Sequence, residues 1–194
     1  MRLGLATTAL VLVSQALVSA HEGGSAAGLL SGLLHPISGF DHVLAMVAVG
    51  IWGAQLGQPA IWMLPVTFPV VMAFGGMLGL LGVPLPGVEI GIGLSALMLG
   101  LVVALERPLG LSLAAALVGF FAVFHGHAHG SELPDGQSGL LYSIGFVGST
   151  GSLHALGIAL GMIHRWKSGR LVLRLSGAVI GVAGLWFVWS AVSG

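Results

Sequence analysis

The chain has 194 residues, of which 56% are hydrophobic and only 6% are charged, whereas about 25% of the residues in an ordinary soluble domain are charged, so a soluble fold is nearly excluded. Six basic and six acidic side chains give a net charge of zero. This balance does not indicate nucleic-acid binding or binding of a polybasic segment to lipid headgroups. At roughly 20 apolar residues per crossing the length suits six or seven helices without a separate catalytic domain, and the lack of cysteine excludes thiolate metal sites and cysteine nucleophiles.

The first twenty residues have the organisation of a secretory signal peptide. Arg2 precedes the apolar stretch Leu3 to Val13, and the small-residue sequence Val18-Ser19-Ala20 follows, which matches a charged region, a hydrophobic region and a cleavage site. Cleavage would make His21 the mature N-terminus. The alternative is an uncleaved first helix, because the stretch is nearly long enough to span a bilayer.

Residues 21–194 are predicted to form a single all-α transmembrane domain, a bundle of six helices. Each predicted helix is an apolar stretch close to the length that one bilayer crossing requires, and clusters of Gly, Pro and polar residues separate the stretches. The predicted spans are 35–54, 60–82, 88–105, 109–127, 140–163 and 171–192. Most of the breaks are short, so consecutive helices should be antiparallel neighbours.

The basic residues predict the orientation of this bundle. If the signal peptide is removed, the mature N-terminus is outside, and the third and fifth breaks then lie on the cytoplasmic side. The basic residues of those breaks and of the start of the last helix all fall on that side, as the positive-inside rule requires; they are Arg107, Arg165, Lys167, Arg170 and Arg174. The predicted location is the bacterial inner membrane, with the mature N-terminus and the C-terminus in the periplasm.

The first predicted helix opens with polar residues that are unusual in a membrane span. Pro36 should lie in its first turn, where no backbone donor is lost, with Asp41 and His42 about two turns further in. A membrane aspartate costs roughly 2.5–3.5 kcal/mol and normally has a partner, so a metal site or a proton path is the first hypothesis. His35 and His42 share a helix face but would be about 10 Å apart in a regular helix, which suits two successive stations.

A second polar cluster lies at the outer end of the fourth predicted helix. If the stretch stays helical, His125 and His129 share one face and His127 points elsewhere; if the helix unwinds after Gly126, His127 can join them. In either geometry two imidazoles are available, and Glu132 can add an oxygen ligand. The alternative is a solvated loop that binds metal only incidentally.

Three further residues are candidates for a metal path. Glu89 begins the third helix at the outer face, where it either lines an entrance or favours the helix dipole. His154 lies roughly 21 Å along the fifth helix, where it is either an inner station or a core histidine bonded to a neighbouring helix. His21 would be near the outer surface after signal cleavage.

The available ligand types limit the metal but do not select it. Histidine and carboxylate ligands without thiolate suit Ni²⁺, Co²⁺ or Zn²⁺ better than Cu⁺ or a hard Ca²⁺ cage. The metal is expected as a transported substrate, and no permanently bound cofactor is predicted. Because neutral imidazole binds metal, uptake should weaken as the pH falls through about 6.5.

Two motifs resemble those of the HupE/UreJ family of membrane proteins. They are His35-Pro36-(x)2-Gly39-x-Asp41-His42-(x)3-Met46 and His125-Gly126-x-Ala128-His129-Gly130-x-Glu132-x-Pro134. The resemblance implies a nickel or cobalt permease of the bacterial inner membrane, associated with hydrogenase or urease maturation. The matching site residues are His35, Asp41, His42, His125, His129 and Glu132, and His127 adds to the outer cluster.

The sequence is therefore interpreted as a Ni²⁺ or Co²⁺ uptake permease and not as an enzyme. Its predicted partners are the divalent metal ion and the lipid bilayer, without nucleic acid, and a homo-oligomer and downstream metallochaperones remain open. One alternative is an intramembrane metal-dependent hydrolase, in which histidines hold a metal with an open water position. Another is a metal-binding accessory or sensor without transport of its own.

Overall fold

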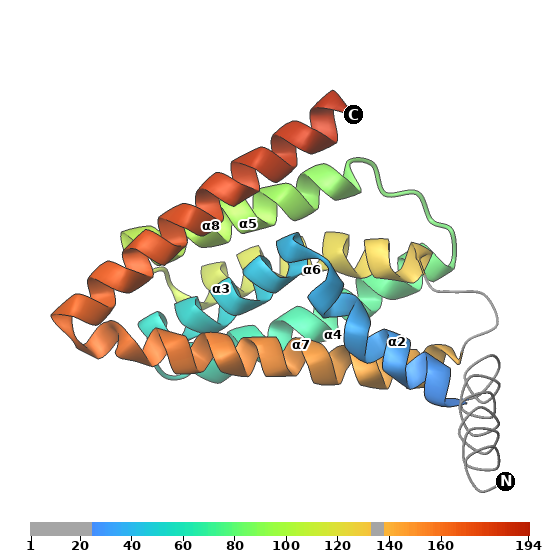
Figure 1. Ribbon diagram of the computed structural model, residues 1–194, viewed down its shortest axis with the longest axis horizontal. Helices are drawn as coiled ribbons and strands as arrows, with labels where there is room; N and C mark the ends of the chain where they lie inside the picture. The colour runs from blue at the N-terminus through green and yellow to red at the C-terminus, as the bar shows by residue number, and fades with distance from the viewer. Residues whose placement is uncertain (1–24, 133–137) are drawn as a thin grey trace, which may run out of the picture.

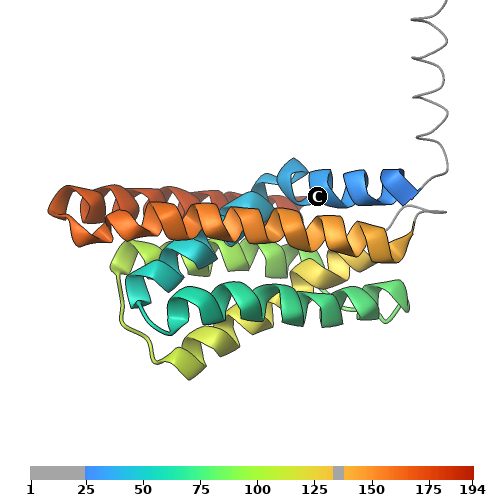
Figure 2. The same cartoon turned by 90° about the horizontal axis from the view of Figure 1, so that it is seen from below.

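The computed structural model describes residues 25–132 and 138–194, which form seven α-helices and one short 3-10 helix without any strand. The helices are α2 (Ser25–Ser38), α3 (Phe40–Leu56), α4 (Ala60–Leu80), α5 (Val88–Leu105), α6 (Leu111–Ser131), α7 (Gly139–Gly161), η1 (Met162–Arg165) and α8 (Lys167–Ser193). The predicted signal peptide, His21 and Pro134 lie outside the described residues. The long helices run roughly lengthwise through the molecule (Figures 1 and 2).

Five stretches are long and apolar enough to cross a membrane singly: α4, α5, α6, α7 with η1, and α8. The helices α2 and α3 meet the same criterion only as a pair, and they are bent by 81° at their junction. The predicted all-helical membrane protein is thus confirmed, with a sixth span only if the bent pair is taken as one. The continuous first span predicted over 35–54 is wrong, because the chain breaks at Gly39.

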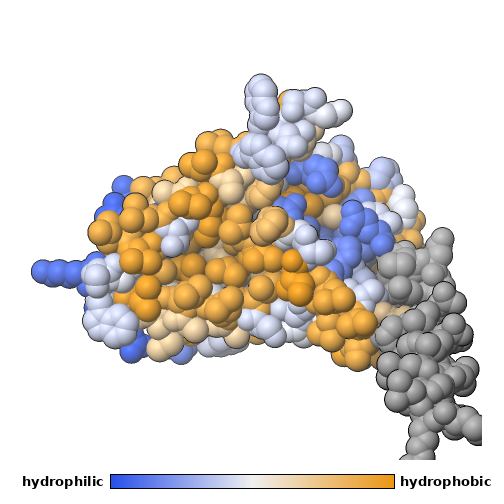
Figure 3. Space-filling model, in the orientation of Figure 1, coloured by the Kyte–Doolittle hydropathy of each residue, from blue (hydrophilic) through white to orange (hydrophobic). Residues whose placement is uncertain are grey.

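The outer surface suits lipid. Many of its large apolar side chains are exposed, among them Phe74, Leu140 and Val179, and a soluble monomer rarely carries so large an apolar surface. In Figure 3 hydrophobic residues cover most of the visible face, and hydrophilic residues gather toward its two ends. We call these the histidine end, where α3 and α5 begin and α6 ends, and the basic end, where α7 leads through η1 into α8.

Glycines bring the helices close enough to build the site. Gly126 and Gly130 of α6 lie directly against the backbone carbonyls of Met72 and Gly76 in α4, so that a Cβ at either glycine would collide with the opposing chain. Such close approach of backbones is the usual way in which helices associate in lipid. It holds the last two turns of α6, which carry the histidines, against α4.

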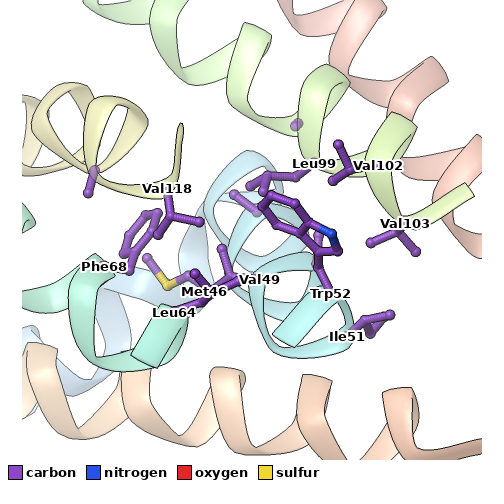
Figure 4. Close-up of a cluster of buried hydrophobic side chains, with 14 of the residues drawn as sticks. Met46, Val49, Ile51, Trp52, Leu64, Phe68, Leu99, Val102, Val103 and Val118 are labelled. Carbon is purple, nitrogen blue, oxygen red and sulfur yellow. The ribbon is translucent and has the colours of Figure 1, made fainter. Parts of the chain in front are cut away.

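The centre of the bundle is a closed apolar core. Side chains from α3, α4, α5 and α6 fill it (Figure 4), including Met46, Trp52, Leu64, Phe68 and Leu99. All five are almost fully buried. The polar residues at the histidine end therefore border a layer of closely packed apolar side chains.

Candidate metal centre

The bend at Gly39 places the first group of site residues. Pro36 lies in the last turn of α2, not in the first turn of a span as predicted, and Gly39 has an extended backbone with φ −101° and ψ 118°. The Ser38 hydroxyl donates a hydrogen bond to the His35 carbonyl at 2.6 Å, which satisfies one of the carbonyls left free where a helix ends. The chain then turns sharply into α3.

Because of this bend, His35 and His42 belong to one cluster. Their ring centroids lie 4.6 Å and 4.3 Å from the ring of His129 in α6. A regular helix would have held them about 10 Å apart along its axis, and the prediction of two widely separated stations is corrected accordingly. His129 is the ring that joins the two.

The helix α6 remains regular through Ser131, which decides between the two geometries that the sequence allowed. His125 and His129 share its inner face, and both are buried. His127 points to another side, where its Nε2 donates a hydrogen bond to the Val83 carbonyl at 2.7 Å. The structure thus brings His125 and His129 into the cluster and leaves His127 outside it.

The outermost part of the cluster is the group best arranged to hold a metal. Ligand atoms of His35, His129 and Glu132 lie within 4.8 Å of one another, and Nε2 of His35 is 3.5 Å from Oε2 of Glu132. The Glu132 side chain is 57% exposed and that of His35 is 26% exposed. Two imidazoles and a carboxylate can therefore meet an ion arriving from outside the protein.

Asp41 orients the next histidine inward. One carboxylate oxygen of Asp41 accepts hydrogen bonds from the backbone N–H of His42 at 2.8 Å and from its Nδ1 at 3.0 Å. A carboxylate only accepts, so Nδ1 carries the proton and Nε2 keeps its lone pair. That Nε2 is buried and has no hydrogen-bond partner within residues 25–132 and 138–194. A carboxylate behind an imidazole in this way is typical of metal-binding histidines.

Ser95 orients His125 in a similar way, although no sequence pattern identified this serine as a site residue. The Ser95 hydroxyl donates to the Ile92 carbonyl at 2.6 Å, so its oxygen accepts the Nε2 proton of His125 at 2.8 Å. The lone pair of His125 is then on Nδ1, which makes no hydrogen bond in the part of the chain that the structure describes. The signal available in the sequence was a single serine in the otherwise apolar run Gly93 to Leu105.

These residues surround a cavity of about 210 Å³ at the histidine end. It is lined by His35, Ser38, Gly39, Asp41, His42, Glu89, Ile92, Ala128, His129 and Glu132. Glu89 is in the first turn of α5, and its place in the cavity wall agrees with the entrance interpretation. The cavity combines exposed carboxylates at its mouth with buried imidazoles further in.

The rings continue inward from the cavity as a row. The ring of His42 lies 4.5 Å from that of His125, and exposure falls from 6% and 7% at His129 and His42 to 0% at His125. We call His35, His129, His42 and His125 the histidine row. His154, in α7, is not part of the row, but the ring of Phe68 contacts both His125 and His154.

Comparison with known proteins gives two matches. The model of a family described as HupE / UreJ protein matches residues 8–187. Protein HupE of Rhizobium leguminosarum bv. viciae is 46% identical over 180 residues, which cover 93% of this chain and 94% of that protein. No solved structure matches the chain.

Proposed function

The chain belongs to the HupE/UreJ family, and from this premise we propose that it is an uptake permease for Ni²⁺, with Co²⁺ as a second cargo, in the bacterial inner membrane. One observation carries the proposal: the exposed carboxylate of Glu132 and the half-buried His35 meet the buried ring of His129, which leads to buried imidazoles with unpaired ring nitrogens. A lipid-exposed bundle with such a row can accept a cation from water and lead it into the membrane. The metal would serve the maturation of hydrogenase or urease.

The ligand chemistry agrees with this cargo. Imidazole nitrogen with carboxylate oxygen suits Ni²⁺, Co²⁺ and Zn²⁺, whereas Ca²⁺ prefers an all-oxygen shell and Cu⁺ prefers sulfur. The described residues include no cysteine, and the exposed ligands His35 and Glu132 are open to exchange with water. An open set of this kind favours capture and release over permanent retention.

Some residues of the site would capture the ion, and others would pass it inward. Glu132 and Glu89 attract the hydrated cation to the cavity, and His35 with His129 replace part of its water shell. His42 can then bind the ion through Nε2, because its Nδ1–H is hydrogen-bonded to Asp41. His125 can bind it through Nδ1, because its Nε2–H is hydrogen-bonded to Ser95. Each hydrogen bond thus keeps a nitrogen lone pair directed away from its partner and available to the ion.

We propose that the histidine end faces the periplasm. The basic residues Arg165, Lys167 and Arg170 lie near the junction of η1 and α8 at the opposite end, which the positive-inside rule assigns to the cytoplasm. Both ends of the mature chain would then be periplasmic. Metallochaperones that receive the ion would bind at the basic end.

Uptake of radiolabelled Ni²⁺ and Co²⁺ into proteoliposomes tests this function. We expect saturable uptake by the parent protein, strong loss in His42→Ala and Asp41→Asn, and parent-level uptake in the matched control His164→Ala, whose histidine is at the basic end. If the parent protein binds the metal but does not take it up, the permease function is wrong and an accessory or sensor role is favoured.

The set His35, His129 and Glu132 also has the ligand types of some catalytic zinc sites, which use two histidines and a glutamate. A metal-dependent hydrolase is therefore the second candidate. Metal exchange separates the two. A hydrolase would retain its ion during dialysis against a second metal, whereas a permease would exchange it readily.

A further inference from the structure

His154 is a buried histidine that the cavity does not reach. It is 1% exposed, and neither of its ring nitrogens makes a hydrogen bond of ordinary geometry with a described residue. The backbone of Pro65 in α4 is close enough to the ring to interact with it electrostatically. A buried polar group without a firm partner destabilises the fold, and a histidine inside a membrane helix generally has a function.

Two oxygen atoms near His154 are also left without a regular partner. Thr150 precedes His154 by one turn on the same face of α7, and its fully buried hydroxyl has no hydrogen-bond partner in the described ranges. The carbonyl of Pro65 would normally accept from the residue four positions later, but that residue is Pro69, which has no N–H. An imidazole, a hydroxyl and a carbonyl are thus available where α4 meets α7.

Phe68 links this place to the histidine row through ring contacts. Its ring centroid lies 5.3 Å from that of His125 and 5.5 Å from that of His154, with a steep interplanar angle in both contacts. The side chain is fully buried and belongs to the apolar core that also contains Met46 and Leu64 (Figure 4). One aromatic ring therefore contacts both the last histidine of the row and His154.

We propose that His154, Thr150 and the Pro65 carbonyl form a second, inner binding site for the transported divalent cation, which the ion reaches from His125 past Phe68. The proposal rests on the proposed function and extends it to the far side of the apolar core. A site with one imidazole and two uncharged oxygens binds less tightly than one with histidines and a carboxylate. Weak binding suits an inner site, because an ion must be able to leave it in order to be conducted.

A single introduced thiol can report whether metal reaches this site, because the chain contains no cysteine. Co²⁺ bound to a thiolate gives a charge-transfer absorption that nitrogen and oxygen ligands do not give. We expect this band when Co²⁺ is added to detergent-solubilised full-length Thr150→Cys, and no band in Ser152→Cys, whose side chain is exposed on another face of α7. His154→Cys should give the same band and serves if Thr150→Cys does not fold. Absence of the band in the folded variants would overturn the inner site.

Removal of the imidazole tests the same site without a thiol. We expect His154→Gln to reduce Ni²⁺ uptake into proteoliposomes at least about tenfold, because mutation even of a residue that only supports a metal ligand typically costs about 10–100-fold in metal affinity or activity, while Ni²⁺ binding to the purified protein stays close to that of the parent. His164→Gln is the matched control. Uptake by His154→Gln at the parent rate would overturn the inner site and leave the permease intact. If the parent protein takes up no Ni²⁺, the permease is wrong, and the Co²⁺–thiolate band alone decides the inner site.

Discussion

At the basic end, Nδ1 of His164 donates to the Gly161 carbonyl at 2.9 Å, and Nε of Arg174 donates to the Ala104 carbonyl at 3.1 Å. At the histidine end, Nε2 of His42, Nδ1 of His125 and both ring nitrogens of His129 are buried and have no hydrogen-bond partner among the described residues. Both ends contain histidine, but the rings of His42, His125 and His129 are buried and lie against one another, whereas His164 is only partly buried. A histidine at this end is therefore a candidate ligand because burial leaves a ring nitrogen unpaired beside other histidines.

The largest expected difference between the two ends comes from His129, which contacts both His35 and His42. We expect His129→Ala to lower Ni²⁺ uptake by about 100-fold, because the outer metal-binding group and the row lose their common member. Proteoliposome uptake with His164→Ala in parallel measures the contrast. Equal losses in both variants would remove the distinction between the two ends.

The second expected effect is on stability and concerns the close contact that supports the row. Gly126→Ala places a methyl group against the Met72 carbonyl, and such overpacking typically costs about 1–3 kcal/mol. Gly151→Ala is the matched control, because a Cβ there meets nothing within 4 Å. Thermal unfolding in detergent should show a lower midpoint for Gly126→Ala only. An unchanged midpoint would contradict the proposed support of α6 by α4.

A smaller effect is expected from Ser95, which orients His125. Ser95→Ala leaves the Nε2 proton of His125 buried without an acceptor, at a cost of about 1–3 kcal/mol. We expect lower thermal stability together with reduced Ni²⁺ uptake, since the ring is free to change its tautomer. Ser152→Ala, at an exposed position, should stay within about 0.5 kcal/mol of the parent. Full uptake by Ser95→Ala would show that the orientation of His125 is unimportant.

The smallest effect at the histidine end is expected from His127. Its Nε2 is bound to the Val83 carbonyl, as His164 is bound to a carbonyl at the basic end. We therefore expect His127→Ala to lose one hydrogen bond, worth about 1 kcal/mol, and to keep its Ni²⁺ uptake close to the parent rate. A loss as large as that of His129→Ala would place His127 in the path of the ion.

Much of the fold was predictable because each helix is specified locally. The predicted span 88–105 coincides with α5, and the others differ from the observed helices mainly at their ends, where hydropathy changes gradually. The first span failed for a physical reason. A hydropathy window averages over Gly39, whereas the backbone changes direction there.

The candidate site was predictable in its residue types and less so in its arrangement. Asp41 and His42 stand out in any membrane helix because charged and polar groups are costly there. The inward orientation of His125 depends on Ser95, which is 30 positions away in the sequence. A contact of that separation leaves no pattern in a single chain, since it depends on how α5 and α6 pack.

The sequence by itself determined the all-helical membrane class, the distribution of basic residues and the residues that are candidates for the site, because these follow from hydropathy, charge and side-chain type. Only the tertiary structure decided that His35 and His42 share one cluster, that His127 lies outside it and that Phe68 contacts both His125 and His154. The reason is geometric. The bend at Gly39 and the packing of α6 against α4 set which side chains meet, and the second of these depends on contacts between segments far apart in the chain.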